Sequence, residues 1–171
     1  MTERGQLVLI AAVVIAVAMV PITLAYLQLG YDDDVESASE VTDPEGDAHR
    51  VLLRAVHAAS VDVPGAYDWA NRSAAVGSVR SDLAPRIESV ETGLLDSGIA
   101  RQVEYNQTAA AEWVRTNCPS GPDRQFGACE ADRGIVVQDR ANRTHVLRVA
   151  LDLETTTDRR ESSVTWVLDA W

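Results

Sequence analysis

Three histidines are the first residues to consider for catalytic or metal-binding chemistry, because imidazole titrates near neutral pH and binds zinc. They are His49, His57 and His145. The first two stand eight residues apart on one expected helix, about two turns, which is too far for a shared metal ion without other ligands. The sequence also has no glycine-rich phosphate loop, nucleophile elbow or HExxH motif. We expect no catalytic residue, metal site or cofactor, and predict that the protein is not an enzyme.

Two cysteines, Cys118 and Cys129, are the only thiols in the chain. They stand 11 residues apart, and the segment between them contains two prolines and two glycines, which favour turns that bring its ends together. A disulfide across so short a loop contributes about 2–3 kcal/mol outside the cytoplasm. The alternative is a metal site, but two thiolates without a nearby histidine supply half of a tetrahedral site. We predict a Cys118–Cys129 disulfide.

Asparagine is scarce, and three of the four asparagines open an Asn-x-Ser/Thr sequon. These three are Asn71, Asn106 and Asn142. Ser and Thr make up 22 of the 171 residues, so chance predicts about 0.5 sequons. The excess is typical of an exported glycoprotein, and each site is a candidate for N-glycosylation. The alternative is that the motif marks turns and helix caps, as it would at Asn106 and Asn142.

A long apolar segment precedes all these residues. Leu7 to Leu29 is 23 residues without a charge, and a helix of that length reaches about 34 Å, enough for a hydrocarbon core of about 30 Å. Arg4 precedes the segment and three aspartates from Asp32 follow it, so we expect a cytoplasmic N-terminus and an extracellular C-terminal domain. The alternative is a cleaved secretory signal, but the apolar core is too long for one. The sequence predicts a single-pass protein of the cell membrane.

The charge of the chain limits its partners. There are 26 acidic residues and 15 basic ones, all of them arginine, and the net charge is −11. Nucleic acid requires a cationic surface, so we expect no nucleic-acid partner. A lysine-free, aspartate-rich composition is similar to that of halophilic archaeal proteins, whose carboxylates keep the surface hydrated in brine. The alternative is a GC-rich genome that prefers arginine codons, which explains the missing lysine but not the acidity.

Beyond the apolar segment, the pattern predicts an α+β fold, with helices first and an antiparallel sheet of three or four strands after them. An acidic stalk is expected at 31–47, although Asp43-Pro44 already has the pattern of a helix start. That helix should end at Val63-Pro64-Gly65. Two more helices are expected at 66–79 and along the apolar stripe from Leu83 to Leu95, stopped by Gly98.

The second half of the chain predicts strands. A strand at 99–105 and a short helix at 108–116 come first, followed by strands at 134–138, 145–153 and 163–171 with a turn at 158–161. In the strand at 145–153, alternation places Leu147, Val149, Leu151 and Leu153 on the core side. The expected core face of the last strand contains Val164, Trp166, Leu168 and Ala170.

The N-terminus resembles a known signal. Arg4-Gly5-Gln6 before the apolar run is similar to the class III signal of archaeal type IV pilin-like proteins. The whole chain also resembles a haloarchaeal family of small, uncharacterised membrane proteins, through Asn117-Cys118-Pro119, the Phe-Gly-Ala-Cys segment at 126–129 and the segment 136–140. The resemblance implies cleavage between Gly5 and Gln6 by a prepilin-type peptidase. It also implies other pilin-like subunits, a secretion-type ATPase and a membrane platform as partners.

This resemblance divides the chain into a leader at 1–5, a transmembrane helix at 6–30, the stalk at 31–47 and an extracellular α+β domain at 48–171. Many pilins have Glu at the fifth mature position, where this chain has Ile10, so a minor pilin or pseudopilin-type subunit is favoured over a major pilin. We expect the sheet and the disulfide loop, with Phe126, to make the contacts of the head. The alternative is a stand-alone membrane-anchored domain that binds an extracellular ligand or partner.

Overall fold

A computed structural model describes residues 43–121 and 126–171 of the chain. The predicted cleavage between Gly5 and Gln6, the transmembrane helix at 6–30 and most of the stalk lie outside these residues. One compact unit extends from Asp43 to Trp171, so its first helix begins inside the segment predicted as stalk. Within the described ranges, no helix is long and apolar enough to cross a membrane.

The unit is α+β, as predicted, but its sheet has five strands instead of three or four. The elements in chain order are α2 (Pro44–Ser60), α3 (Val63–Ala66), η1 (Trp69–Asn71), α4 (Arg72–Thr92), η2 (Leu95–Ser97), β1 (Ala100–Tyr105), α5 (Gln107–Asn117), β2 (Phe126–Asp132), β3 (Ile135–Arg140), β4 (Arg143–Thr156) and β5 (Glu161–Asp169). The pattern did not predict β2, whose sequence Phe-Gly-Ala-Cys-Glu-Ala-Asp lacks a clear alternation of apolar and polar residues.

Helix α2 begins where the sequence predicts. The Asp43 carboxylate accepts a hydrogen bond from Gly46 N at 2.8 Å, and Pro44 lies in the first turn, where a helix does not use its N–H. The prediction for its other end was wrong in detail. Val63-Pro64-Gly65 does not simply end the helix but forms part of α3, because a proline in a first turn also starts a new helix.

Helix α4 replaces the two helices predicted at 66–79 and 83–95. It is continuous over 21 residues and includes Leu83 and Val90 of the predicted stripe as buried residues. The prediction was wrong for Leu95, which lies in η2 and is 53 % exposed. The helix ends before that residue, and Gly98, with φ of 72°, closes η2 instead.

Strand β4 is the centre of the sheet, and all its pairings are antiparallel. Strand β5 pairs with residues 148–156 along one edge of β4. The other edge is shared, since β3 pairs with 143–149 and β1 with 151–156, which places β1 and β3 end to end. Strand β2 continues the sheet beyond β3, whereas β1 has no second strand partner among the described residues. Strand β1 is therefore an edge strand.

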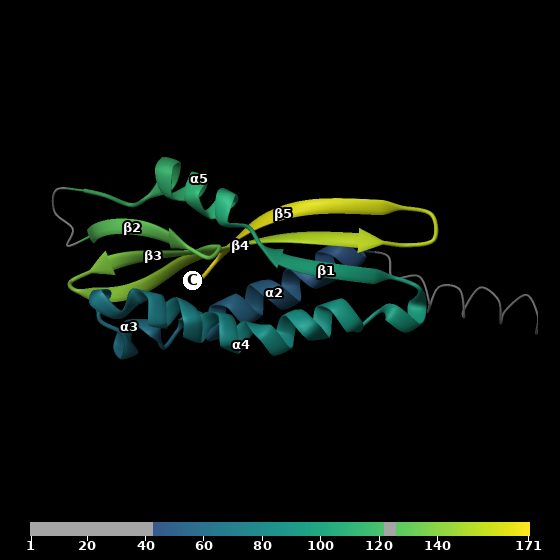
Figure 1. Cartoon of the computed structure of the whole chain (residues 1–171), viewed down its shortest axis with the longest axis horizontal. Coiled ribbons are helices and arrows are strands. Elements are labelled where there is room, and N and C mark those ends of the chain that lie inside the picture. Colours follow the sequence, from purple (N-terminus) through teal and green to yellow (C-terminus); the bar gives the residue numbers. More distant parts are fainter. Residues whose placement is uncertain (1–42, 122–125) are drawn as a thin grey trace, which may run out of the picture. The chain divides into compact units, whose positions relative to one another are not determined.

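Helices cover both faces of this sheet (Figure 1). Helices α2 and α4 pack on one face, and the main core lies between them and the strands. Its fully buried members include Leu52, Val56, Val79, Leu83, Ile135, Leu151 and Leu153. Helix α5 covers part of the other face, above a smaller core of Ala110, Val136, Leu147 and Ala150. The result is a three-layer domain with the sheet in the middle.

Leu147 faces the opposite side of the sheet from the predicted one. Val149 and Leu151 belong to the main core, as alternation predicts, but Leu147 belongs to the core under α5. The register between β3 and β4 shifts at this point of β4, which marks a β-bulge. An extra residue in one strand turns the following side chains over, so simple alternation fails there.

Candidate functional site

The predicted disulfide between Cys118 and Cys129 is present, with Cα atoms 5.9 Å apart. Gln138 of β3 is fully buried beside it and holds the loop through its side-chain amide. Its Nε2 donates to the carbonyl oxygens of Pro119 at 2.8 Å and Gly127 at 3.2 Å. Because a buried amide is costly to leave unpaired, these bonds specify the position of both ends of the loop. Sequence reasoning missed Gln138; a polar residue directly after the apolar run 135–137 was the available signal.

Aromatic side chains lie next to this loop. The Arg140 guanidinium carbon is 4.4 Å from the ring centre of Phe126 and 5.3 Å from that of Trp171. Trp171 is 60 % exposed and stacks on His145, with ring centroids 6.0 Å apart. Burial and, secondly, the Arg140 charge lower the pKa of His145. This cation–π cluster presents an aromatic surface to solvent.

A second feature is an open groove of about 880 Å³ between α4 and β1, which we name the α4–β1 groove. Its lining residues from α4 include Gly77, Arg80, Ser81, Ala84, Glu88 and Glu91, and those from β1 are Val103, Glu104 and Tyr105. The Arg80 guanidinium carbon lies 3.7 Å from the centre of the Tyr105 ring. At the other end, Glu91 Oε1 accepts a hydrogen bond from Val103 N at 2.9 Å, so a side chain occupies an amide of the β1 edge.

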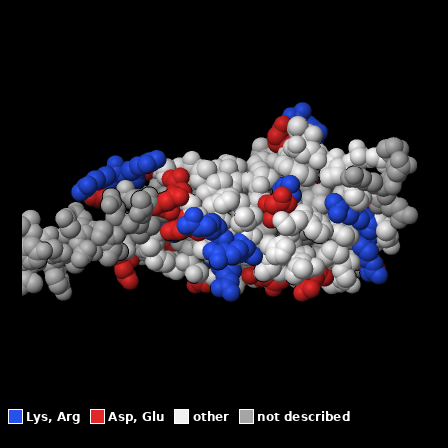
Figure 2. Space-filling model, turned by 180° about the vertical axis from the view of Figure 1, so that it is seen from behind, with Lys and Arg blue, Asp and Glu red and all other residues white. Residues whose placement is uncertain are grey.

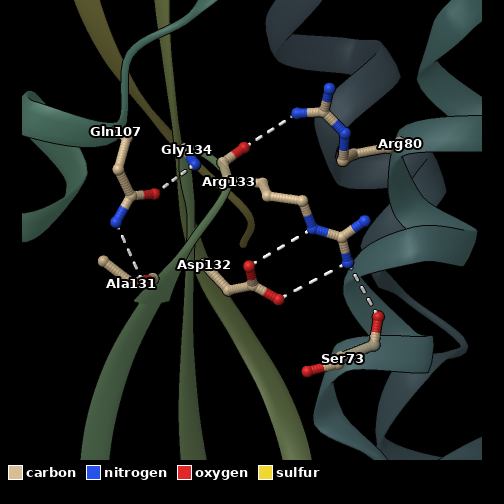
Figure 3. Close-up of polar contacts among 7 residues, drawn as sticks. All are labelled: Ser73, Arg80, Gln107, Ala131, Asp132, Arg133 and Gly134. Atoms are coloured by element: carbon tan, nitrogen blue, oxygen red, sulfur yellow. Dashed lines mark hydrogen bonds and ion pairs between the residues drawn. The ribbon is translucent and has the colours of Figure 1, made fainter.

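The turn between β2 and β3 contributes Arg133 to the lining of this groove, beside Arg80. Figure 3 shows the polar contacts that hold this turn. Arg80 donates to Arg133 O at 2.8 Å, and the Arg133 guanidinium bonds Ser73 O at 2.9 Å and the Asp132 carboxylate. Gln107 accepts from Gly134 N at 2.8 Å and donates to Ala131 O. The turn is thus tied to α4 on one side and to α5 on the other, and both arginines are held by contacts within the domain.

The three sequon asparagines have different environments. Asn106 Oδ1 caps α5 by accepting from Ala109 N at 2.7 Å, and its Nδ2 donates to the Asp152 carboxylate at 2.9 Å. Both ends of this amide are used, as the cap interpretation predicts. Asn142 is exposed in the β3–β4 turn with φ of 64°, and Asn71 is exposed at the start of α4. A hydrogen bond from Trp69 N to Asn142 O places these two sequons on one side of the domain.

The histidines are separated in the structure. His49 meets Trp166 edge to face at 5.1 Å, His57 is exposed on α2, and His145 stacks on Trp171. Residues 43–121 and 126–171 contain no group of three or more His, Cys, Asp or Glu side chains that could hold a metal ion. Charged side chains on the face drawn in Figure 2 form small groups of both signs, with uncharged surface between them. That face offers no continuous cationic area.

The fold and these sites define an α+β domain with a disulfide-closed loop, an aromatic cluster and an open groove beside an edge strand. Residues 1–169 match the family described as Family of unknown function (DUF7261), and the chain belongs to that family. The chain has no significant similarity to a curated protein or to a solved structure.

Proposed function

We propose that this protein is a pilin-like structural subunit, of the minor pilin or pseudopilin type, in a cell-surface filament or secretion assembly. The observation that carries the proposal is Arg4-Gly5-Gln6 directly before 23 uncharged residues. A peptidase that cuts after Gly5 leaves a mature chain that begins with this apolar segment. Such a segment binds the membrane and packs against the same segment of other subunits.

Bonds within the described domain support a structural role. The disulfide and the buried Gln138 amide hold the two ends of the loop between α5 and β2, and the Arg133–Gly134 turn is bonded to two helices. A subunit whose surfaces keep one shape loses little conformational entropy when it binds its neighbours. A prepilin-type peptidase, a secretion-type ATPase and a membrane platform are the partners that this function requires.

The N-terminus of the mature protein tests this proposal. We expect mass spectrometry of the full chain from native membranes to find a start at Gln6. In the control variant Gly5→Val, the leader should remain, because the peptidase site is lost while the apolar segment is unchanged. A native chain that starts at Met1 or Thr2 would exclude pilin-type processing, and a start near Tyr26 would exclude the membrane anchor as well.

The second candidate is a stand-alone membrane-anchored extracellular domain that binds a ligand or partner. The α4–β1 groove favours it, because an open hollow of about 880 Å³ is large enough for part of a peptide or a small molecule. An uncleaved N-terminus together with a monomeric protein in the membrane would support this candidate over the pilin-like subunit.

A further inference from the structure

Three strands of the described sheet have one free edge each, namely β1, β2 and β5, and β1 and β5 lie on opposite sides of β4 (Figure 1). A free edge pairs with another strand unless a side chain or an irregularity blocks it. On β1, the Glu91 carboxylate occupies the Val103 amide. On β2, the register shifts and Gln107 Nε2 donates to Ala131 O at 3.0 Å. The domain therefore partly closes two of these three edges itself.

The edge of β5 has no such protection among the described residues. The strand pairs with β4 over nine residues without a register shift, and Ser162 to Leu168 contains no charged residue, proline or glycine. Ala170 N donates to Leu147 O at 3.2 Å, so even-numbered residues turn their N–H and C=O groups toward β4. The odd-numbered residues from 161 to 169 turn theirs outward, where no described residue bonds them. This edge is therefore open along its whole length.

Apolar side chains border the open edge on both faces of the sheet. Val164 and Trp166 pack against the main core but remain half-buried, because the sheet ends there. On the other face Val167 is 37 % exposed, next to the exposed Ser163 and Thr165. In a contact between strands, backbone hydrogen bonds give affinity and the flanking side chains give specificity. The β5 edge therefore has the features of an interaction surface for another strand.

An antiparallel copy of β5 itself fits this edge. In the register centred on Val164, the two Val164 residues lie opposite each other, and Ser163 of each copy lies opposite Thr165 of the other. Facing Ser and Thr hydroxyls are favourable cross-strand neighbours, and each valine meets an apolar side chain. The uncharged middle of the strand is thus complementary to itself.

Charge selects this register. It places Glu161 opposite Val167 and leaves Asp169 beyond the paired segment. A register centred on Thr165 would instead place Glu161 opposite Asp169, and like charges at facing positions repel. The segment from 161 to 167 therefore pairs with its own copy without opposing any two carboxylates.

The place where the chain enters the domain is compatible with this pairing. Ser162 Oγ donates to Glu45 Oε1 at 2.6 Å, so α2 begins beside the start of β5. In the register centred on Val164, the two Ser162 residues lie about 13 Å apart along the strands. Residues 31–42, which connect the predicted anchor to the domain, reach about 40 Å when extended. Two copies anchored in one membrane are therefore able to pair.

We propose that β5 pairs antiparallel with β5 of a second copy of this chain, so that two five-stranded sheets join into one. The outward groups of residues 161, 163, 165 and 167 then exchange about eight backbone hydrogen bonds. Both copies use the same surface, so the contact closes as a symmetric dimer and does not extend into a chain of subunits. The inference goes beyond the proposed function, because it requires the anchored domain but not the cleaved leader.

Cysteine crosslinking of the full chain in membranes tests the pairing. Val164→Cys should form a reducible disulfide-linked dimer and no larger multimer, because the Cα atoms of this non-hydrogen-bonded pair lie about 4.5 Å apart. The native cysteines are joined to each other and do not interfere. Gln102→Cys, exposed on β1, is the matched control and should give about tenfold less dimer, because its thiols meet only by collision. No dimer from Val164→Cys, or equal yields from both variants, would overturn the pairing.

A charge at the centre of the edge tests the same contact. In the Val164→Cys chain, Thr165→Lys should lower the dimer yield about tenfold, because an edge lysine opposes strand addition, whereas Thr165→Ser should leave it unchanged. About 1 M KCl screens the repulsion between the two acidic heads during both measurements. An unchanged yield with Thr165→Lys would refute the contact at β5.

Hydrogen exchange shows whether Thr165→Lys still folds. The amides of Ser163, Thr165 and Val167 should exchange slowly in the native full chain and rapidly in the variant. The amides of Val164 and Trp166 face β4 and should stay protected in both. Rapid exchange of the odd-numbered amides in the native chain would show that this edge is not paired.

The outcome is separable from that of the proposed function. A chain that starts at Gln6 but gives no dimer from Val164→Cys would refute the pairing and leave the pilin-like subunit in place. A dimer from a chain that keeps Met1 would establish the pairing and exclude pilin-type processing. If the crosslinked band instead contains another protein, β5 pairs with a different partner and the proposal of a second copy is wrong.

Discussion

Gly134 is the residue at which β1 and β3 meet on the shared edge of β4. Its φ is 84°, and a Cβ there would lie 2.8 Å from Tyr105 Cβ and 3.3 Å from Ala150 O. Ala150 N also bonds Gly134 O at 2.8 Å. Both the backbone conformation and the space therefore require glycine at this position.

We expect Gly134→Ala to lower the free energy of unfolding by about 2–4 kcal/mol, from the positive φ and the steric overlap together. Gly98→Ala is the matched control, because Gly98 has φ of 72° but an added Cβ there would meet no other atom within 4 Å. This control substitution should cost about 1 kcal/mol. Urea denaturation measures both values; equal losses would show that the junction of β1 and β3 tolerates a side chain.

His145 should make the stability pH-dependent. Burial lowers its pKa in the folded state below the ordinary value of 6.5, so the unfolded chain binds more protons just below that pH. Stability therefore rises with pH through this window and is lost as the pH falls below about 6.5. Denaturation between about pH 4.5 and 8 measures the slope. His145→Gln should flatten it, and an unchanged slope would assign the effect to another group.

The sequons should differ in modification. Asn71 and Asn142 are exposed, whereas the Asn106 amide is bound at both ends. Peptide mapping of protein from native membranes should find glycan at Asn71 or Asn142 and none at Asn106. Glycan on Asn106 would mean that the chain is modified before α5 acquires its cap.

Among the elements, the loop between α5 and β2 has both of its ends held in place by two separate interactions. The disulfide joins residues 11 apart in sequence, and the Gln138 amide bonds the backbone at 119 and 127. The bulge in β4 also contributes to the packing of α5, because it turns Leu147 toward that helix. The position of α5 therefore depends on both the loop and the bulge.

Removal of the disulfide by Cys118→Ala with Cys129→Ala should lower the free energy of unfolding by about 3 kcal/mol, since the unfolded chain regains the entropy of the open loop. Reductant should produce the same loss in the native chain and none in the variant. Denaturant unfolding with and without reductant measures both. Complete alkylation of both cysteines without reductant would show that the disulfide is absent from the native protein.

The domain as a whole carries excess negative charge. From Asp43 onward there are 20 acidic residues and 14 arginines, and the register places Glu104 directly opposite Asp152 on neighbouring strands. Like charges at such positions repel at low ionic strength and are screened by salt. The acidic composition thus has a local structural consequence in the sheet.

We expect the midpoint of thermal unfolding to rise by several degrees between about 0.05 and 1 M KCl, where the Debye length falls to about 3 Å. Glu104→Gln should be more stable than the native chain at low salt and equal to it at high salt, because it removes one of the two facing carboxylates. Calorimetry measures the midpoints. A salt response that is identical in both chains would exclude this pair as its source.

Local patterns were enough to predict the start of α2 at Asp43-Pro44, the strand and helix on either side of Asn106, and the Cys118–Cys129 pairing. Each depends on residues close together in the sequence, such as a cap, a proline or a short loop between thiols. The N-terminal signal and anchor are also sequence predictions, and they lie outside the described residues.

Other features depend on which distant segments the fold brings together. The bond between Asn106 and Asp152 joins residues 46 apart, and the bulge that turns Leu147 arises from the pairing of β3 with β4. The α4–β1 groove exists because β1 ends the sheet beside small residues of α4. Strand register and helix packing are set by the burial of the whole core, so no short window of sequence contains them.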